Sequence, residues 1–235
     1  MMKRSLLPVA FLALASGCTP APDAAMLNGL VYCTEGSPES FNPQLVTSGT
    51  TIDAISQQLY DRLLDIDPNN GNLLPALATN WQISDDGLTY VFNLRDDVEF
   101  HQTEYFSPTR KLSASDIEFT FNRILDIHHP FHQTATEYPY FDSVEWRELV
   151  KSVTAVSQSQ VIFQLNKPDS SFLSTLATDF AAILSAEYGE LLQKNQELPQ
   201  LDTLPIGTGP FKFREYKKDV LIRYYRNGNY WRKTG

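Results

Sequence analysis

The residue types that could do chemistry are few in this sequence, and one group of them stands close together. His128, His129 and His132 form the only histidine cluster, and Glu137 follows near enough to suggest a further metal ligand. Zinc ligands need fixed spacing on rigid elements, however, and Pro130 interrupts any helix through the cluster. We interpret the cluster as a polar surface loop that follows a helix, and the sequence predicts no metal site.

Patterns for nucleophilic, phosphate-binding and acid–base chemistry are equally weak. Serine is abundant without a Gly-x-Ser-x-Gly elbow, and the glycine-rich run Ile206–Phe211 lacks the Lys-Ser/Thr ending of a phosphate loop. The carboxylate pairs Asp85-Asp86 and Asp96-Asp97 fall in turns, where solvated side chains are far commoner than acid–base pairs. His101, although flanked by acids, is interpreted as an ordinary loop histidine. We infer that the chain is not an enzyme and uses no cofactor.

The first 17 residues have the order of an export signal, with Lys3-Arg4, an apolar run from Leu6 to Leu14, and small residues up to Cys18. The apolar run is too short to span a bilayer. Ala15-Ser16-Gly17-Cys18 fits the box before a lipid-modified cysteine, so we expect a lipid anchor at Cys18. The alternative is ordinary cleavage after Ala15 or Ala25, which would release a soluble protein. Residues 18–29 have the small, proline-rich composition of a tether.

The charge and the cysteines restrict the partners. Loss of Lys3 and Arg4 with the signal leaves 17 basic against 28 acidic side chains, a net charge of −11. Nucleic acid is therefore not expected as a partner, since phosphate binding needs a basic surface. Cys18 and Cys33 are the only cysteines, and they could pair in an oxidising compartment. If Cys18 carries lipid, Cys33 has no partner within this chain.

Several local patterns predict the elements that must position these residues. Trp81–Ile83 and Tyr90–Leu94 alternate apolar and polar residues on either side of the turn Ser84–Gly87, which predicts a hairpin. Ser115 and Glu118 match a capping box that would begin a helix over 115–126. Further expected elements are a buried strand at 30–33, a loop at 34–51, strands at 150–156 and 160–165, helices near 171–178 and 185–195, and a last hairpin at 211–216 and 220–225.

One more helix is expected near the start of the exported chain. Apolar residues recur at helical spacing from Ile52 to Leu64, which predicts a helix over 51–62 that Thr50 or Thr51 could cap. Hairpins and helices follow one another without regular alternation, which indicates an α/β or α+β chain of one large or two small domains.

The order of several motifs is familiar. They are "PALA" at 75–78, "SDDGLTYVFNLRDDVEFH" at 84–101, "LSASDIEF" at 112–119, "GTGPF" at 207–211 and "NYW" at 229–231. Together they resemble the signature of the peptide-binding proteins of bacterial ABC importers, extracellular solute-binding protein family 5. "VYCTEGSPESFNPQ" and "TSGTT" look like the dipeptide- and haem-binding branch. "QLYDRLLDIDP", "YFSPTRKL", "PYFDSVE" and "SAEY" look more like the Sap-type proteins linked to antimicrobial peptides, and we favour that branch.

The resemblance implies a periplasmic binding protein type II-like α/β fold, in which two lobes close on a peptide by hinge bending. Residues 30–51 and 206–235 would belong to a partial first lobe, and residues 52–205 to an accessory domain. Because relatives are about twice as long, we expect a fragment or a truncated gene product that lacks the second lobe. The implied setting is a periplasmic monomer that delivers peptides to the permease subunits of an ABC importer.

The same resemblance suggests binding residues. Thr47, Ser48, Gly49 and Thr50 would line the ligand cleft, because exposed backbone groups can pair with an extended peptide whatever its side chains. A helix-capping loop is the plain alternative for this segment, and Cys33 would be structural. Two other functions remain open: a haem-binding protein on the same scaffold, and a remnant that binds nothing.

Overall fold

The computed structural model describes residues 29–135 and 137–232. The chain divides into two compact units, Met1–Cys33 and Thr34–Gly235. In the first unit, residues 29–33 form no strand, and the side chains of Leu30 and Val31 are 93% and 72% exposed. The prediction of a buried strand at 30–33 is therefore wrong, because a strand needs a partner and none of the described strands pairs with this run. The expected signal, the tether up to residue 28 and Cys18 lie outside the described residues.

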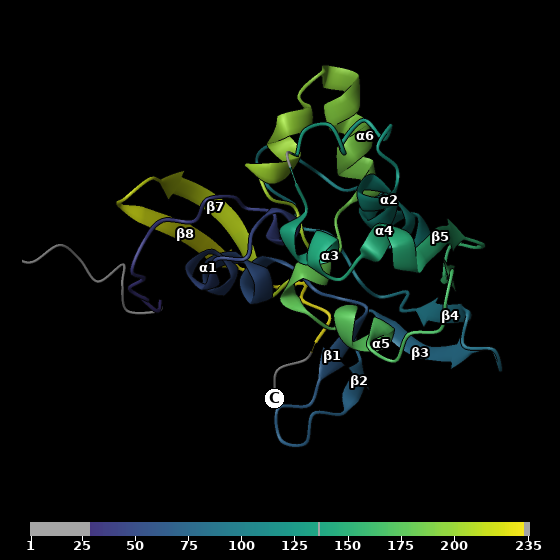
Figure 1. The fold of residues 1–235 in the computed structure, drawn as a ribbon. Coiled ribbons are helices and arrows are strands. Elements are labelled where there is room, and N and C mark those ends of the chain that lie inside the picture. Colours follow the sequence, from purple (N-terminus) through teal and green to yellow (C-terminus); the bar gives the residue numbers. More distant parts are fainter. Residues whose placement is uncertain (1–28, 136, 233–235) are drawn as a thin grey trace, which may run out of the picture. The chain divides into compact units, whose positions relative to one another are not determined.

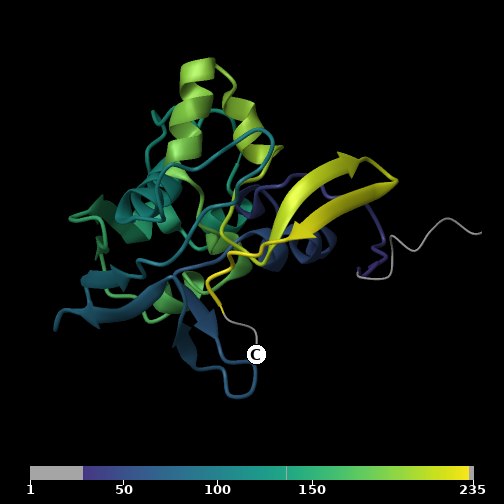
Figure 2. The same ribbon diagram turned by 180° about the vertical axis from the view of Figure 1, so that it is seen from behind.

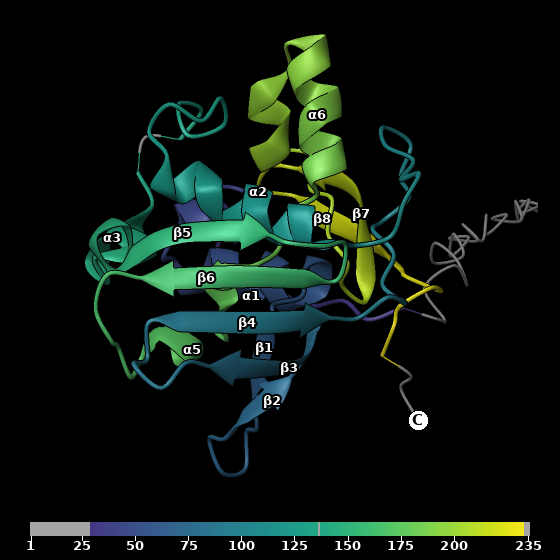
Figure 3. The ribbon, with the colours of Figure 1, turned by 90° about the vertical axis from the view of Figure 1, so that its right-hand side faces the viewer.

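The second unit contains a four-stranded antiparallel sheet of order β3-β4-β6-β5 (Figure 3). Its strands are β3 Ala78–Ile83, β4 Thr89–Leu94, β5 Val150–Ala155 and β6 Gln160–Leu165. Trp81 lies opposite Phe92 across the first hairpin, and Tyr90 lies opposite Phe163 where the two hairpins meet. The hairpin predicted around Ser84–Gly87 and the strands predicted near 150 and 160 are confirmed.

Helix α2, Ala114–Leu125, packs on β5 and β6. Phe121 contacts Trp146 and Phe163 at ring-centroid distances of 5.3 and 5.2 Å, and Trp146 stacks on Phe172 at 5.9 Å. Such aromatic packing buries much apolar area and dominates the energetics of a core. The sheet and α2 therefore share one aromatic core.

The helix prediction for this region is correct in type and shifted at its start. The N-cap is Ser113, whose backbone N–H donates to the Asp116 carboxylate at 2.8 Å, so the capping box is Ser113–Asp116 and not Ser115–Glu118. Arg110 holds both oxygens of that buried carboxylate, at 2.6 and 2.8 Å. Because Arg110 fixes the Asp116 carboxylate, the helix begins at Ala114, one residue before the predicted start.

The remaining elements of the second unit are short. The predicted helices near 171–178 and 185–195 are present as α5 and α6, and a turn at Asp67–Gly71 joins two short strands. The bounds are α3 Pro139–Ser143, α4 Trp146–Leu149, α5 Phe172–Thr175, α6 Ala186–Asn195, the 3-10 helices η2 Pro43–Leu45, η3 Asp179–Ala181 and η4 Leu198–Asp202, and the strands β1 Leu64–Ile66 and β2 Leu73–Pro75.

Helix α1, Gly49–Leu59, and the last hairpin lie side by side (Figures 1 and 2). The hairpin, β7 Phe211–Lys217 with β8 Leu221–Arg226, is confirmed. Tyr224 fixes it to α1, because its hydroxyl donates to the Ala54 carbonyl at 2.7 Å. The predicted lobe boundary at residue 52 falls inside α1, and the division into lobe and accessory domain stays a prediction. Within the described ranges, no helix is long and apolar enough to cross a bilayer.

Candidate functional site

The segment predicted to line a ligand cleft, Thr47–Thr50, forms the entry to α1. Val46 and Ser48 have extended backbones, with φ and ψ of −139° and 155° and of −65° and 121°. The helix begins at Gly49 with Ser48 at the N-cap position. The prediction that Thr50 or Thr51 caps the helix is wrong, since the Thr51 hydroxyl accepts a hydrogen bond from the Glu39 N–H at 3.2 Å. Thr47 and Gly49 are exposed.

The backbone of this segment makes few hydrogen bonds, although Val46 itself is buried and only Thr47 and Gly49 are exposed. Among the described residues, the only backbone hydrogen bond of residues 46–48 runs from the Ile52 N–H to the Ser48 carbonyl, at 3.0 Å. The Ser48 side chain also makes no capping bond. The first N–H groups of a helix lack intrahelical partners and carry the positive end of its dipole. The segment therefore offers backbone that is extended at Val46 and Ser48 and leads into the unpaired N–H groups at the start of α1.

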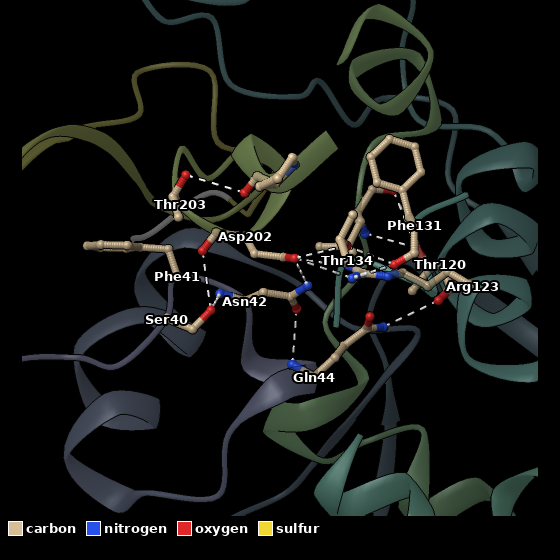
Figure 4. Close-up of polar contacts among 12 residues, drawn as sticks. Ser40, Phe41, Asn42, Gln44, Thr120, Arg123, Phe131, Thr134, Asp202 and Thr203 are labelled. Atoms are coloured by element: carbon tan, nitrogen blue, oxygen red, sulfur yellow. Dashed lines mark hydrogen bonds and ion pairs between the residues drawn. The ribbon is translucent and has the colours of Figure 1, made fainter. Parts of the chain in front are cut away.

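Both sides of this segment are held firmly, which gives the open edge a defined position. On the upstream side, Asn42 caps η2, its side chain accepting the Gln44 N–H at 3.0 Å. The Asn42 amide also donates to Asp202 at 2.7 Å (Figure 4). On the downstream side, Ile52, Ile55 and Leu59 of α1 are buried.

Asp202 is the centre of a buried polar network (Figure 4). Its carboxylate accepts from Arg123 at 3.2 Å and from Thr134 at 3.4 Å, and its carbonyl accepts the Phe41 N–H at 2.9 Å. The Arg123 side chain is fully buried and also donates to the Phe131 carbonyl and the Tyr138 hydroxyl, at 3.2 and 3.1 Å. A buried charge is tolerated when it is paired and hydrogen-bonded in this way.

Sequence reasoning missed the role of these two residues. The buried residues of α2 include Thr120 and Arg123, whose polar partners Leu184 and Asp202 lie far along the chain. An isolated arginine in an amphipathic helix is usually solvated, and its partner Asp202 lies far along the chain. The one local sign of its burial in the sequence is that Arg123 lies beside the apolar residues of this helix.

The glycine-rich run 206–211 packs against the C-terminal end of α1. A Cβ atom on Gly207 would lie 1.9 Å from the Leu59 carbonyl oxygen, and one on Gly209 would lie 2.5 Å from the Leu59 carbonyl carbon. The Gly209 N–H donates to that Leu59 oxygen at 3.0 Å. These glycines permit close backbone approach, and they serve packing here.

His101 hydrogen-bonds to the backbone of the glycine-rich run 206–211. Its Nε2 lies 2.9 Å from the Gly209 carbonyl, which can only accept, and the Gly207 N–H donates to its Nδ1 at 3.4 Å. These partners define a neutral imidazole protonated on Nε2. Burial lowers the pKa of His101 to about 4. The residue interpreted as an ordinary loop histidine lies in a loop, but it is buried and structural.

Asp61, just after α1, collects three further donors. Its carboxylate accepts from the Thr208 hydroxyl at 2.8 Å, the Tyr230 hydroxyl at 3.0 Å and the Trp231 Nε1 at 2.9 Å. Burial raises its pKa, while these hydrogen bonds oppose the shift. Two guanidinium groups contact the Trp231 ring, with Arg95 at 4.4 Å and Arg232 at 4.6 Å from its centroid. The "GTGP" and "NYW" motifs therefore meet at one carboxylate.

The other polar residues considered from the sequence make contacts that stabilise local structure. The Nδ1 of His132 lies 2.7 Å from the Arg123 carbonyl, and His129 packs on Phe119 with ring centroids 5.4 Å apart. Asp86 accepts the Leu88 N–H at 3.0 Å in the hairpin turn, and Asp97 pairs with Arg95 at 2.8 Å. In the two ranges that the structure describes, no group of three or more His, Cys, Asp or Glu side chains is placed to hold a metal.

The mixed α/β fold is that of solved periplasmic binding proteins. The dipeptide-binding protein from Pseudoalteromonas sp. SM9913, solved in complex with Met-Leu, matches with a TM-score of 0.85 and 48% sequence identity, over 87% of this chain and 40% of that one. The model of bacterial extracellular solute-binding proteins, family 5, middle region, matches residues 72–235. The chain belongs to this family, which confirms the resemblance seen in its motifs.

Curated relatives agree with that membership. The peptide transport periplasmic protein SapA of Salmonella typhimurium is 47% identical over 206 residues, which are 87% of this chain and 38% of that protein. Heme-binding protein A of Haemophilus influenzae is 45% identical over the same extent, with the same coverage. The chain thus spans about two fifths of the length of the relatives it matches. These identities are too similar to separate the branches.

Proposed function

We propose that this chain forms part of the substrate-binding component of an ABC-type peptide importer in the periplasm. The observation that carries the proposal is the backbone of Val46–Ser48 at the entry to α1. It is extended at Val46 and Ser48, makes a single backbone hydrogen bond, and is held by buried partners on both sides. An extended peptide recognised through its main chain needs such an edge. The peptide-related names of two similar proteins support this reading.

Thr47, Ser48, Gly49 and Thr50 are on this proposal the ligand-contacting residues. The peptide's backbone pairs with the open edge, and the unused N–H groups at the start of α1 favour a ligand carbonyl or carboxylate there. The motifs "YFSPTRKL" and "PYFDSVE" favour a Sap-type ligand, a peptide that includes the antimicrobial kind. The partners are the permease subunits, and the working form is a monomer.

The test follows the amide protons of residues 46–51 by hydrogen exchange while di- to octapeptides are added. Because the chain spans about two fifths of its relatives' length, we expect binding weaker than micromolar, with exchange slowed in this segment. Binding that protects a different segment, or no protection at about 10 mM peptide, a concentration that would detect even millimolar affinity, would refute the assignment.

A matched pair of variants sharpens the test. Ser48→Pro removes one backbone donor, and its φ of −65° already suits proline. Ser48→Ala removes only the hydroxyl. If the Ser48 N–H faces the ligand, the proline variant binds several-fold more weakly, as for one lost hydrogen bond of about 1 kcal/mol, and the alanine variant binds like the parent.

A haem-binding function is a second candidate, because Heme-binding protein A is 45% identical to this chain. The buried His101 is occupied by the backbone of Gly207 and Gly209, so it is not available as an axial ligand without unfolding that contact. Titration with haem, followed by visible absorbance, separates the two functions. A saturable spectral change would favour haem.

We also propose that Cys18 anchors the exported chain through lipid. Cys33 is an exposed free thiol in the described part of the chain, and Cys18 lies outside that part, so the structural role of Cys33 stays a prediction. Mass spectrometry of the exported chain tests both points, since acylation adds a fixed mass at Cys18 and alkylation without reductant labels Cys33.

A further inference from the structure

A polar cavity lies away from the α1 entry, between the loop that leads into α2 and the base of the β7–β8 hairpin. Its volume is about 290 Å³. From the loop it is lined by Glu99, Gln102 and residues 108–111, and from the hairpin side by Lys212, Asn227 and Asn229. This volume is at the lower end for small-molecule sites, so it suits a compact ligand and not a folded partner.

The charge in this cavity is opposite to that of the whole chain. Arg110, Lys111 and Lys212 face a single acid, Glu99, although the chain as a whole carries a net charge of −9. A local positive cleft in an acidic protein raises the local concentration of small anions, because walls of low dielectric focus the field.

Two of the three cations have no acid of their own. Asp116 holds the Arg110 guanidinium through both of its oxygens, and the Asn229 amide donates to the Glu99 carboxylate at 3.0 Å. Over the described part of the chain, neither Lys111 nor Lys212 forms an ion pair. Glu99 keeps its negative charge beside this neutral amide. With Arg110 neutralised by Asp116, Lys111 and Lys212 (+2) against Glu99 (−1) leave the lining with a net charge of +1.

The backbone that carries these groups is fixed on both sides. Lys111 pairs with Glu99 in an antiparallel bridge, and Lys212 lies in β7 opposite Tyr225. The Asn227 amide donates to the Gly209 carbonyl at 3.0 Å, and the Asn227 N–H donates to the Pro210 carbonyl at 2.7 Å. A ligand that binds here therefore orders little beyond two lysine side chains, which limits its entropic cost.

We propose that this cavity is a binding site for a small multivalent oxyanion, one that carries carboxylate or phosphate groups. Lys111 and Lys212 supply the two charged donors, and the Gln102 side chain is a further polar group in the lining. The site shares no residue with the Thr47–Thr50 segment, so the inference does not rest on peptide binding.

Calorimetry of the 235-residue chain at constant ionic strength tests the proposal, with citrate, inorganic phosphate and monovalent acetate as separate probes. We expect saturable one-to-one binding of citrate or phosphate with a dissociation constant below about 1 mM, and far weaker binding of acetate. Preference for citrate or for phosphate identifies the group that the site takes. A linear response up to about 10 mM of every probe, as for general screening, would overturn the proposal.

Charge-matched variants distinguish a site from general attraction. The double variant Lys111→Gln/Lys212→Gln should weaken binding at least tenfold for each lysine replaced, because a hydrogen bond from a charged donor is worth about tenfold or more. The control Lys151→Gln/Lys194→Gln removes two exposed lysines outside the cavity and the same net charge. Equal weakening in both double variants would overturn the assignment. All four lysines are at least partly exposed, and equal melting temperatures would verify that the variants fold.

Discussion

Replacing Asp202 with alanine should destabilise the protein more than any surface charge change. The substitution leaves the fully buried Arg123 guanidinium without its counter-ion, and it leaves the buried Asn42 amide without the acceptor that lies 2.7 Å away. Removing one partner of a buried ion pair costs about 3–5 kcal/mol. A single domain is stable by only about 5–15 kcal/mol, so Asp202→Ala should remove a large fraction of that free energy of unfolding.

Urea unfolding followed by circular dichroism and by tryptophan fluorescence measures this loss, and coincident transitions check two-state behaviour. Asp202→Asn keeps an acceptor and should lose less. Arg123→Leu/Asp202→Ala removes both charges and should recover part of the loss, because no buried charge is left unpaired. Asp97→Ala is the control, since its pair with Arg95 is half-exposed and worth about 0.2–1 kcal/mol. If Asp202→Ala cost no more than Asp97→Ala, the buried network would not stabilise this fold.

Two further predictions concern the glycine-rich run and its histidine. Gly207→Ala should destabilise the protein by more than about 3 kcal/mol, because a Cβ atom would overlap the Leu59 carbonyl and force the backbone apart. Gly228 has open space around it, so the control Gly228→Ala should change the free energy of unfolding by less than about 0.5 kcal/mol. Equal urea midpoints for the two variants would contradict the close packing of Gly207. The pKa of His101 is lowered to about 4 in the folded protein, so between about pH 6.5 and 4 the imidazole is protonated in the unfolded chain and neutral in the folded one. The free energy of unfolding should therefore fall by roughly 3 kcal/mol as the pH drops through this range. His101→Gln should flatten this part of the urea-derived stability profile relative to the parent, and an unchanged slope would show that His101 titrates normally. The pKa of Asp61 is raised in the folded protein, so its titration increases stability as the pH falls, opposite to the effect of His101. Only the difference between the stability profiles of the parent and of His101→Gln therefore reports on His101.

Local patterns were sufficient to predict the hairpins of this fold. The turn at Ser84–Gly87 and the alternation on either side of it lie within a few residues, and the observed pairing of Trp81 with Phe92 follows from them. The start of α2 was misplaced by one residue, and its cap by two, because Asp116 is fixed by Arg110 and by burial. Propensity alone could not separate Ser113 from Ser115.

The network around the candidate site depended on distant partners and could not be predicted. Arg123 and Asp202 are ordinary surface residue types, and they are buried because the fold brings α2 and η4 together although the two lie far apart in the sequence. The family resemblance pointed to Thr47–Thr50, while the scarcity of backbone hydrogen bonds at residues 46–48 depends on the surrounding fold and has no signature in the sequence. The segment Leu30–Tyr32 is a case in which the local pattern misled, because its apolar residues predicted a buried strand but have no strand partner and are exposed.

The strand order β3-β4-β6-β5 has a consequence for how the chain reaches its native state. Each outer pair is a local hairpin, and such hairpins form in about 1–10 μs. The central pairing of β4 with β6 is different, because Tyr90 must find Phe163 across an intervening segment that contains α2, α3 and α4. Closing that long loop is the entropically costly step. We expect the transition state for folding to contain α2 docked on both preformed hairpins, with α1 and the β7–β8 ribbon joining afterwards.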